Sequence, residues 1–463
     1  MPKFNGGTEI DMKKWFIVHN GNIEALKLVF AAVSEYIVIS CISQNELTEE
    51  IKKSGCLIYI GVKNMLDVPK GGYRIKAYKN EFGNDTVILD GDGYVNELYS
   101  AVDFKNKYMV KALNADVHMP VYYFNDIFNC DMPEYDESFV PYIKERSLWT
   151  WGYVIYDYKG YIDNMLRLKL NMLIIWNDYP PENASELIEY AHKKGVKIIW
   201  GFSWGWSTKC NLDNIADLDK LTDDIINEYE SRYAHLGGDG IYFQTFTETN
   251  EEKFGDIVIA DAAVKLVNQT SDKLLKKYPN LHIQFGLHAT SVKEKLEYIK
   301  NVDSRVTILW EDCGAFPYDY IPKRIENFDE TADFTGKIKN LRESGFGVLF
   351  KGMTALDWSS FEHQPGYFVI GEYDKAFTDK KLIEKKKIWK YVQAYWLSNA
   401  KYVKEIVDML DSDTLVSALV EDGLFDEKIW YPVALYAEIL WNPKRKTEDI
   451  LTETALIGDV SFA

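Results

Sequence analysis

The fold is decided by the segment from Asn171 to Phe202, which reads NMLIIWNDYPPENASELIEYAHKKGVKIIWGF. It opens and closes on short apolar runs, Met172–Trp176 and Val196–Trp200, which are typical of parallel strands covered on both faces. Between the two runs, the spacing of apolar residues predicts an amphipathic helix over Ala184–Lys194. Strand, helix and strand in this order form the repeating unit of parallel α/β folds.

The same unit repeats on both sides of this segment. The predicted strands are Ser147–Tyr153, Asn171–Trp176, Lys197–Phe202, Gly240–Thr247, His282–His288, Thr307–Glu311 and Gly347–Gly352. This succession predicts a (β/α)8 barrel over residues 145–400, with an eighth strand that the sequence does not place. A doubly wound open sheet is the alternative, but such sheets rarely reach this number of repeats without a glycine-rich phosphate turn.

Two further regions flank the predicted barrel. Residues 12–135 alternate short strands and helices and predict a small α/β domain, in which Tyr73–Tyr78 and Thr86–Asp90 form an edge pair of the sheet. Prolines and acidic residues between Asp116 and Tyr142 predict a linker. Residues 401–463 have helical periodicity and predict a C-terminal helical segment.

The composition argues against several classes of protein. Of the 463 residues, 27% are charged and 47% are hydrophobic, as in an ordinary soluble globular protein. The formal net charge is −18, so neither nucleic acid nor an anionic membrane is an expected partner. The sequence also shows no apolar stretch long enough for a membrane span or a signal peptide.

Cysteines, histidines and glycines give no indication of a cofactor. The 5 cysteines are scattered without a Cys-x-x-Cys pair, which favours reduced thiols and a cytoplasmic location. The histidines lack His-x-x-x-His or His-x-His spacing, so no metal site is predicted. No Gly-x-Gly-x-x-Gly or Gly-Lys-[Ser/Thr] motif follows a strand, so no nucleotide site is predicted and no cofactor is expected.

The C-terminal ends of the barrel strands, where such barrels place their active sites, are rich in aromatic, acidic and amide side chains. Aromatic faces stack on sugar rings, whereas carboxylates and amides bind sugar hydroxyls, so the pattern predicts a pocket for a carbohydrate substrate. Any one of the tryptophans could equally be a core residue. The candidate substrate-binding residues are Arg146, Trp149, Trp151, Trp176, Asn177, Asp178, Trp204, Trp206, Gln244, His288, Trp310, Lys351, Trp358 and His363.

Glycoside hydrolysis requires two carboxyl groups that flank the scissile bond. Glu248 is the first candidate for the general acid, because it closes an apolar strand next to Phe246. The alternative is that Glu248 belongs to a capped helix start. The candidates for the second carboxylate are Glu311 and Asp312, which point to opposite sides in an extended strand, with Asp312 on the side of Trp310. Asp178 and Glu362 are further candidates.

Four stretches resemble glycoside hydrolases related to family 20 hexosaminidases and family 67 α-glucuronidases. Arg146-Ser-Leu-Trp149-Thr-Trp151-Gly152, followed by Tyr161-Ile-Asp163-Asn164-Met165, resembles the first barrel unit of these enzymes. Gly72-Tyr73-Arg74-Ile75 resembles their preceding α/β domain, and Leu440-Trp441-Asn442-Pro443 resembles their last helices. The resemblance implies a glycosidase with a barrel and a preceding small domain.

The chain departs from this family on the fourth strand. Family 20 enzymes carry an Asp-Glu pair after two glycines, whereas Gly237-Gly238-Asp239 is followed here by Gly240. The dyad is therefore absent, and the acid on this strand would be Glu248. Because Asp239 precedes the predicted strand, we expect it to have a structural role at the opposite end of the barrel. A barrel that binds carbohydrate without catalysis remains the alternative function.

Overall fold

The computed structural model describes residues 13–33, 39–105, 132–151, 155, 157–177, 179–202, 215–246, 251–288, 294–311, 327–353, 367–369, 371, 375–420 and 429–457. The chain divides into two compact units, Met1–Pro141 and Tyr142–Ala463. Within the described ranges, no helix has the length and apolar character needed to cross a membrane.

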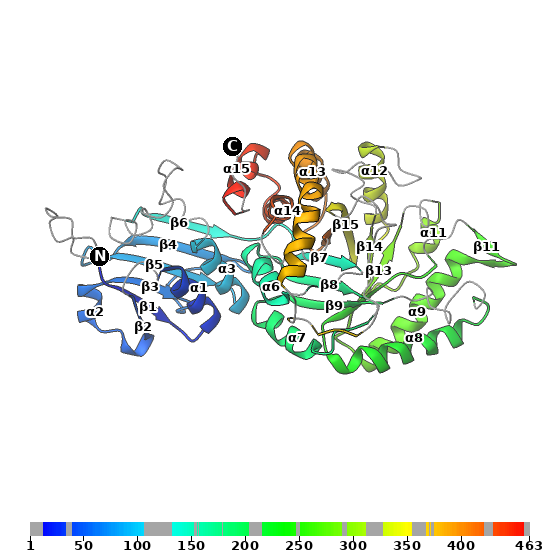
Figure 1. Cartoon of the computed structure of the whole chain (residues 1–463), viewed down its shortest axis with the longest axis horizontal. Coiled ribbons are helices and arrows are strands. Elements are labelled where there is room, and N and C mark those ends of the chain that lie inside the picture. The colour runs from blue at the N-terminus through cyan, green and yellow to red at the C-terminus, as the bar shows by residue number, and fades with distance from the viewer. Residues whose placement is uncertain are drawn as a thin grey trace. The chain divides into compact units, whose positions relative to one another are not determined.

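The first unit is built on a six-stranded sheet (Figure 1) with the strand order β2-β1-β3-β5-β4-β6. Strands β2, β1, β3 and β5 are parallel, whereas β4 is antiparallel to both β5 and β6. Helices α1, α2 and α3 follow β1, β2 and β5 along the chain. The bounds are β1 (Trp15–His19), α1 (Ile23–Val33), β2 (Ile39–Ser43), α2 (Glu49–Ser54), β3 (Cys56–Ile60), β4 (Tyr73–Lys79), β5 (Asp85–Gly91), α3 (Tyr94–Asp103) and β6 (Tyr135–Phe139).

The sequence predicted the β4–β5 pair correctly but did not predict β6. Strand β6 lies within the segment predicted to be a linker, and Asp136, Glu137 and Ser138 occupy its middle. It pairs with β4 alone and forms the edge of the sheet. A short, charged edge strand lacks the apolar run by which buried strands are recognised.

The second unit is a closed barrel of eight parallel strands, which confirms the predicted (β/α)8 fold. All seven strands predicted from the sequence are present. The strand bounds are β7 (Glu145–Trp151), β8 (Met172–Trp176), β9 (Lys197–Gly201), β10 (Gly240–Phe243), β13 (His282–Leu287), β14 (Val306–Trp310), β15 (Phe346–Met353) and β16 (Leu415–Val420).

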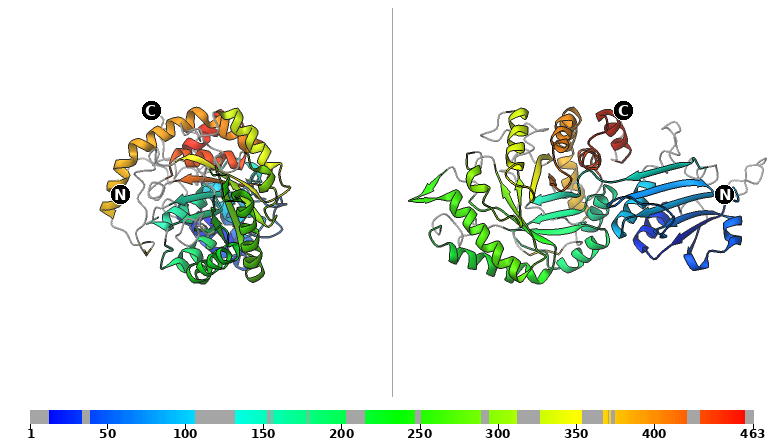
Figure 2. Two further views of the ribbon diagram at one scale, coloured as in Figure 1. Left: turned by 90° about the vertical axis from the view of Figure 1, so that its right-hand side faces the viewer. Right: turned by 180° about the vertical axis from the view of Figure 1, so that it is seen from behind.

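Helices lie outside the strands of this barrel (Figure 2), and a small hairpin of β11 (Lys253–Phe254) and β12 (Ile257–Val258) follows β10. Two more helices follow the last strand. The helix bounds are α6 (Tyr158–Arg167), α7 (Ala184–Lys193), α8 (Leu218–Arg232), α9 (Ile259–Lys277), α11 (Leu296–Ile299), α12 (Phe328–Lys339), α13 (Lys375–Asp408), α14 (Tyr431–Trp441) and α15 (Thr447–Ile457).

The eighth strand corrects the predicted end of the barrel. Strand β16 lies beyond residue 400, in the region predicted to be only helical, and it pairs with β15 and β7. Its sequence, LVSALV, is buried throughout. Periodicity alone does not distinguish such a short apolar run from a buried stretch of helix. The C-terminal helical segment therefore begins after β16, with α14 and α15.

Residues of each strand face alternately the barrel interior and the surrounding helices. On β14, Ile308 and Trp310 pack in the large hydrophobic cluster beneath the helices, whereas Leu309 packs in a smaller interior cluster with Trp149 and Tyr242. This alternation fixes which side chains at the strand ends face the barrel axis.

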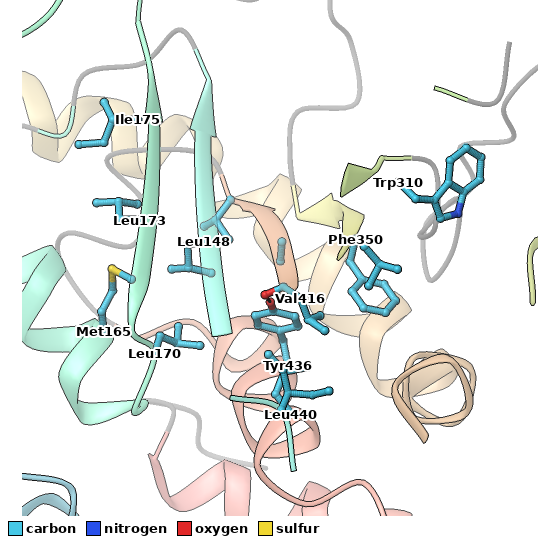
Figure 3. Packing of buried hydrophobic residues seen from close by; sticks show 14 of the residues in the cluster. Leu148, Met165, Leu170, Leu173, Ile175, Trp310, Phe350, Val416, Tyr436 and Leu440 are labelled. Atoms are coloured by element: carbon cyan, nitrogen blue, oxygen red, sulfur yellow. Dashed lines mark hydrogen bonds between the residues drawn. The ribbon is translucent and has the colours of Figure 1, made fainter. Parts of the chain in front are cut away.

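Helix α14 packs against the outside of the barrel, and all its residues are buried. The Tyr436 hydroxyl donates to the backbone oxygens of Ser147, at 2.9 Å, and Val416, at 3.0 Å, so one side chain ties α14 to both β7 and β16. Figure 3 shows Tyr436 and Leu440 of this helix close to Val416. The contacts join the C-terminal helices to the strands that close the barrel.

Candidate active site

A buried carboxylate, Glu311, lies at the C-terminal end of β14. Trp310 faces the helices and packs against Phe334 of α12, so strand alternation directs Glu311 toward the barrel axis. The Glu311 side chain has no solvent exposure. A buried carboxylate needs hydrogen bonds or opposite charges to offset its desolvation, and four side chains from neighbouring strands supply them.

The two carboxylate oxygens of Glu311 have different surroundings. The Tyr242 hydroxyl donates to Oε1, and Gln244 Nε2 donates to the same oxygen at 2.5 Å. His288 Nε2 lies 3.0 Å from Oε2, and Lys351 Nζ lies 3.4 Å from it. Among the described residues, Oε2 has no aligned hydrogen-bond donor despite these ion-pair distances. Oε1 is therefore fixed by two hydrogen bonds, whereas Oε2 is held mainly by charge.

These side chains come from strands that are neighbours in the barrel. Tyr242 is on β10, Gln244 follows it directly, His288 follows β13 and Lys351 is on β15. The strands stand in the order β10-β13-β14-β15, so Glu311 lies between its partners. Lys351 Nζ also lies 3.4 Å from His288 Nδ1. The group thus joins four consecutive strands at one end of the barrel.

A glycine on β13 makes room for this arrangement. A Cβ atom at Gly286 would lie 2.7 Å from Tyr242 Cζ and would overlap both Tyr242 Oη and Glu311 Oε1. Gly286 does not have a left-handed backbone, so the need for glycine here is one of space. Any larger residue would displace the hydrogen bond between Tyr242 and Glu311.

Three aromatic rings, called the aromatic floor below, pack on one another in the barrel interior, and one of them contacts the carboxylate. The ring centroid of Trp149 lies 5.9 Å from that of Trp176 and 5.2 Å from that of Tyr242. Trp176 and Tyr242 are 5.5 Å apart. All three rings belong to the interior hydrophobic cluster. Tyr242 links the two parts of the site, because its ring packs on the tryptophans and its hydroxyl binds Glu311.

Two further residues of note follow barrel strands at this end, namely Asn177 after β8 and Phe246 after β10. Asn177 follows β8 directly and is buried. After β10, Phe246 has a left-handed backbone with φ of 51°, which is unusual for an aromatic residue. The Phe246 side chain packs on a small cluster that includes Ile215 and Ile259. This packing holds the strained residue at the start of the segment that carries Glu248.

Four of the predicted site residues therefore lie together, namely Glu311, Gln244, His288 and Lys351, with Trp149 and Trp176 in the aromatic floor. Eight other predicted residues lie outside the described ranges: Glu248, Asp312, Asp178, Trp204, Trp206, Trp358, Glu362 and His363. For Trp151 the structure describes only the backbone, as the last residue of β7.

The structure corrects two predicted substrate-binding residues, Arg146 and Trp310. Arg146 lies near the beginning of β7, and its guanidinium donates to the backbone oxygens of Lys169, Ile143 and Lys144. It therefore lies at the opposite end of the barrel from Glu311. Trp310 faces outward, and its indole Nε1 donates to Thr335 Oγ1 at 3.2 Å. Neither residue faces the carboxylate.

The expected structural role of Asp239 is confirmed. Its carboxylate accepts a hydrogen bond from the Ile198 backbone nitrogen at 2.8 Å and lies 2.9 Å from His192 Nε2. Gly238 has a φ of +105°, and a Cβ there would lie 2.7 Å from Trp200 Nε1. The Gly-Gly-Asp sequence thus forms the turn into β10, at the end of the barrel away from Glu311.

Sequence reasoning missed Tyr242 and Gly286. A signal for Tyr242 was present, because it precedes Gln244 by two positions and therefore shares its face of the strand. Gly286 gave no comparable signal, since its role depends on a contact between β10 and β14 across β13. Among the described residues, no group of three or more His, Cys, Asp or Glu side chains is placed to hold a metal ion.

Known structures share this fold. A β-N-acetylhexosaminidase from Bacteroides fragilis matches with a TM-score of 0.53 and 11% identity, over 96% of this chain and 90% of that chain. A mutant β-hexosaminidase of Streptomyces plicatus in complex with product GlcNAc matches with a TM-score of 0.52 and 10% identity, over the same shares. No sequence family and no curated protein matches the chain. At these identities the similarity establishes the fold, and function depends on the site.

Proposed function

We propose that this protein is a glycoside hydrolase in which Glu311 is one of two reacting carboxyl groups. The observation that carries the proposal is a fully buried carboxylate at the C-terminal end of the barrel, oriented by four side chains next to the aromatic floor. This end of the fold is where such barrels carry out their chemistry. Solved structures of this fold include enzymes that act on N-acetylhexosamines, which makes such sugars the first candidates.

We assign Glu311 the role of nucleophile or general base rather than that of general acid. Tyr242 and Gln244 donate to Oε1, and His288 and Lys351 place positive or donor groups near Oε2. These contacts fix the orientation of the carboxyl group at the strand end. Oε2, which has no aligned donor among the described residues, is the oxygen we assign to attack on the anomeric carbon or activation of water.

The general acid in this proposal is Glu248, two residues after Phe246. The strained backbone of Phe246 supports this assignment, because strain of this kind concentrates at functional sites. Asp312 is the alternative to Glu311 as the second carboxylate, but strand alternation favours Glu311. The sugar would contact Trp176, Asn177 and Gln244, with Asp178, Trp151, Trp204, Trp206, Trp358 and His363 as further proposed contacts.

Carbohydrate binding without catalysis is the second candidate function. It is favoured by the same contacts, because a carboxylate held on both oxygens can also serve as a fixed hydrogen-bond acceptor for a sugar. The two candidates differ in one measurable property. Only the hydrolase produces free sugar from a glycoside, whereas both bind the ligand.

The test is a panel of 4-nitrophenyl glycosides that begins with the N-acetyl-β-glucosaminide and the β-glucuronide. On any substrate cleaved, Glu311→Gln should lower kcat by roughly 10²–10⁴, the usual contribution of a catalytic carboxyl group. Asp239→Asn is the matched control, because it removes a carboxylate from the opposite end of the same barrel and should leave kcat within about twofold.

The outcomes separate the two candidates. Product release that Glu311→Gln abolishes and Asp239→Asn spares supports the hydrolase. Binding of a sugar with no turnover across the panel favours the binding protein. Equal turnover by wild type and Glu311→Gln would show that Glu311 is not a reacting group.

A further inference from the structure

The indole nitrogen of Trp149 is buried without a partner. Trp149 is only 4% exposed, and among the described residues its Nε1 has no hydrogen-bond acceptor. An indole N–H can donate but not accept. Buried donors are nearly always paired in folded proteins, so an unpaired one calls for an explanation.

Two other buried tryptophans of the same barrel have paired indole nitrogens. Trp200 Nε1 donates to the Gly237 backbone oxygen at 2.8 Å, and Trp310 Nε1 donates to Thr335 Oγ1 at 3.2 Å. Both of these side chains face the helices rather than the barrel interior. The fold therefore supplies an acceptor for each of these outward-facing indoles, whereas Trp149 Nε1, on an inward-facing ring, has none among the described residues.

The unmatched indole belongs to the floor of the candidate active site. The Trp149 ring packs against those of Tyr242 and Trp176, and the Tyr242 hydroxyl donates to Glu311. Because these rings cover Trp149 and so little of it is exposed, its ring face offers little area for a sugar to stack on. Its Nε1 is buried as well, so the N–H is the one polar group of this ring that a ligand oxygen would satisfy on entering the site.

We propose that the Trp149 N–H donates a hydrogen bond to an oxygen of the bound sugar. The proposal rests on the proposed carbohydrate-binding function of the same site and adds a specificity determinant to it. The ligand group must be an acceptor, namely a hydroxyl, ring or carbonyl oxygen, because the indole accepts nothing in return. Because no described residue accepts from this donor, its removal should cost the fold little and cost the complex a hydrogen bond.

The experiment exchanges the N–H for sulfur by replacing Trp149 with 3-benzothienylalanine, which preserves the shape of the ring system. The same replacement at Trp200 is the matched control, since that N–H is paired within the protein. Calorimetric titration with N-acetylglucosamine and with glucuronic acid measures affinity, and thermal unfolding measures Tm. The glycoside panel is run on the wild-type protein in parallel.

The proposal predicts opposite results at the two positions. At Trp149 the affinity should fall roughly 3- to 10-fold, as expected for one neutral hydrogen bond, with Tm unchanged. At Trp200 the affinity should hold while Tm falls by roughly 2–4 °C.

Two results would overturn the assignment of Trp149 alone. One is a Trp149 variant that binds the sugar as tightly as the wild type does. The other is a fall in Tm at Trp149 that equals the fall at Trp200, because the N–H would then be paired in the free protein. If the wild type binds neither sugar and cleaves no glycoside, the proposed function itself has failed, and the role of Trp149 fails with it.

Discussion

Gly286→Ala provides a direct test of how the site is built. The added methyl group would lie 2.7 Å from Tyr242 Cζ and would overlap Tyr242 Oη and Glu311 Oε1. Overpacking of a filled interior costs about 1–3 kcal/mol, and loss of a hydrogen bond to a charged group costs about 1.5–3 kcal/mol. Alanine regains about 0.5–1 kcal/mol of chain entropy relative to glycine. We therefore expect a net loss of about 2–5 kcal/mol in the free energy of unfolding.

Urea unfolding measures this loss, and near-UV circular dichroism reports on the aromatic floor. Gly336→Ala is the matched control, because a Cβ there meets only Met409 Cε, at 3.4 Å, on a helix. That change should stabilise the protein by about 0.5–1 kcal/mol. If Gly286→Ala unfolds at the same urea concentration as the wild type, the steric account of the site is wrong.

A double-mutant cycle with Tyr242→Phe sharpens the test. Removal of the Tyr242 hydroxyl vacates part of the space that the new methyl group needs. The combined loss for Gly286→Ala and Tyr242→Phe should therefore be smaller than the sum of the two single losses, by about 1 kcal/mol or more. If the two losses in the free energy of unfolding are strictly additive, the new methyl group and the Tyr242 hydroxyl do not compete for the same space.

Three further predictions concern single side chains. Burial, together with the neighbouring Glu97, raises the pKa of Asp90 to about 6. Because this pKa is higher in the folded than in the unfolded protein, the free energy of unfolding should fall by up to about 3 kcal/mol as pH rises from about 4 to about 6. Asp90→Asn should remove this pH dependence and stabilise the protein at pH 7 by about 1–3 kcal/mol. The prediction is contradicted if the wild type and Asp90→Asn unfold at the same urea midpoint both at pH 5 and at pH 7. Arg146→Met removes the donor to the buried backbone oxygens of Lys169 and Ile143, whereas Lys144 keeps its hydrogen bond from Asn171 Nδ2. The change should cost about 2–5 kcal/mol in urea unfolding and leave the sugar affinity of the folded protein unchanged. Loss of sugar affinity without a change in stability would show that Arg146 does belong to the site. Glu248→Gln should lower turnover of an unactivated glycoside by roughly 10²–10⁴ and that of a 4-nitrophenyl glycoside far less, and equal losses in the two rates would exclude its role as general acid.

The fold was largely predictable because both faces of the barrel strands are buried. Runs such as Met172–Trp176 therefore stand out as apolar stretches between amphipathic helices. Strand β16 has the same apolar character but lies between helices, so its pairing with β7 and β15 could not be inferred from local pattern. Strand β6 was not predictable for the opposite reason, because its charged residues are typical of a loop.

The candidate site was predictable only in part. Alternation along β14 separates Glu311 from Trp310, and the same rule would have assigned Tyr242 to the interior. Arg146 shares a strand with two tryptophans, yet it lies where the strand begins rather than where it ends. The contacts of Glu311 with His288 and Lys351 depend on strand neighbours that are distant in sequence, which no local pattern reveals.

The late position of β16 has a consequence for how the chain folds during synthesis. Barrel closure pairs Glu145 with Leu415, so the first strand of the barrel has no partner on this side until residue 415 and those around it have left the ribosome. Until then the sheet has two unpaired edges, which are prone to pair with other chains. Contacts this distant in sequence also form slowly. We expect expression to be limited by aggregation of the open sheet, and chains truncated before Leu415 to accumulate in the insoluble fraction.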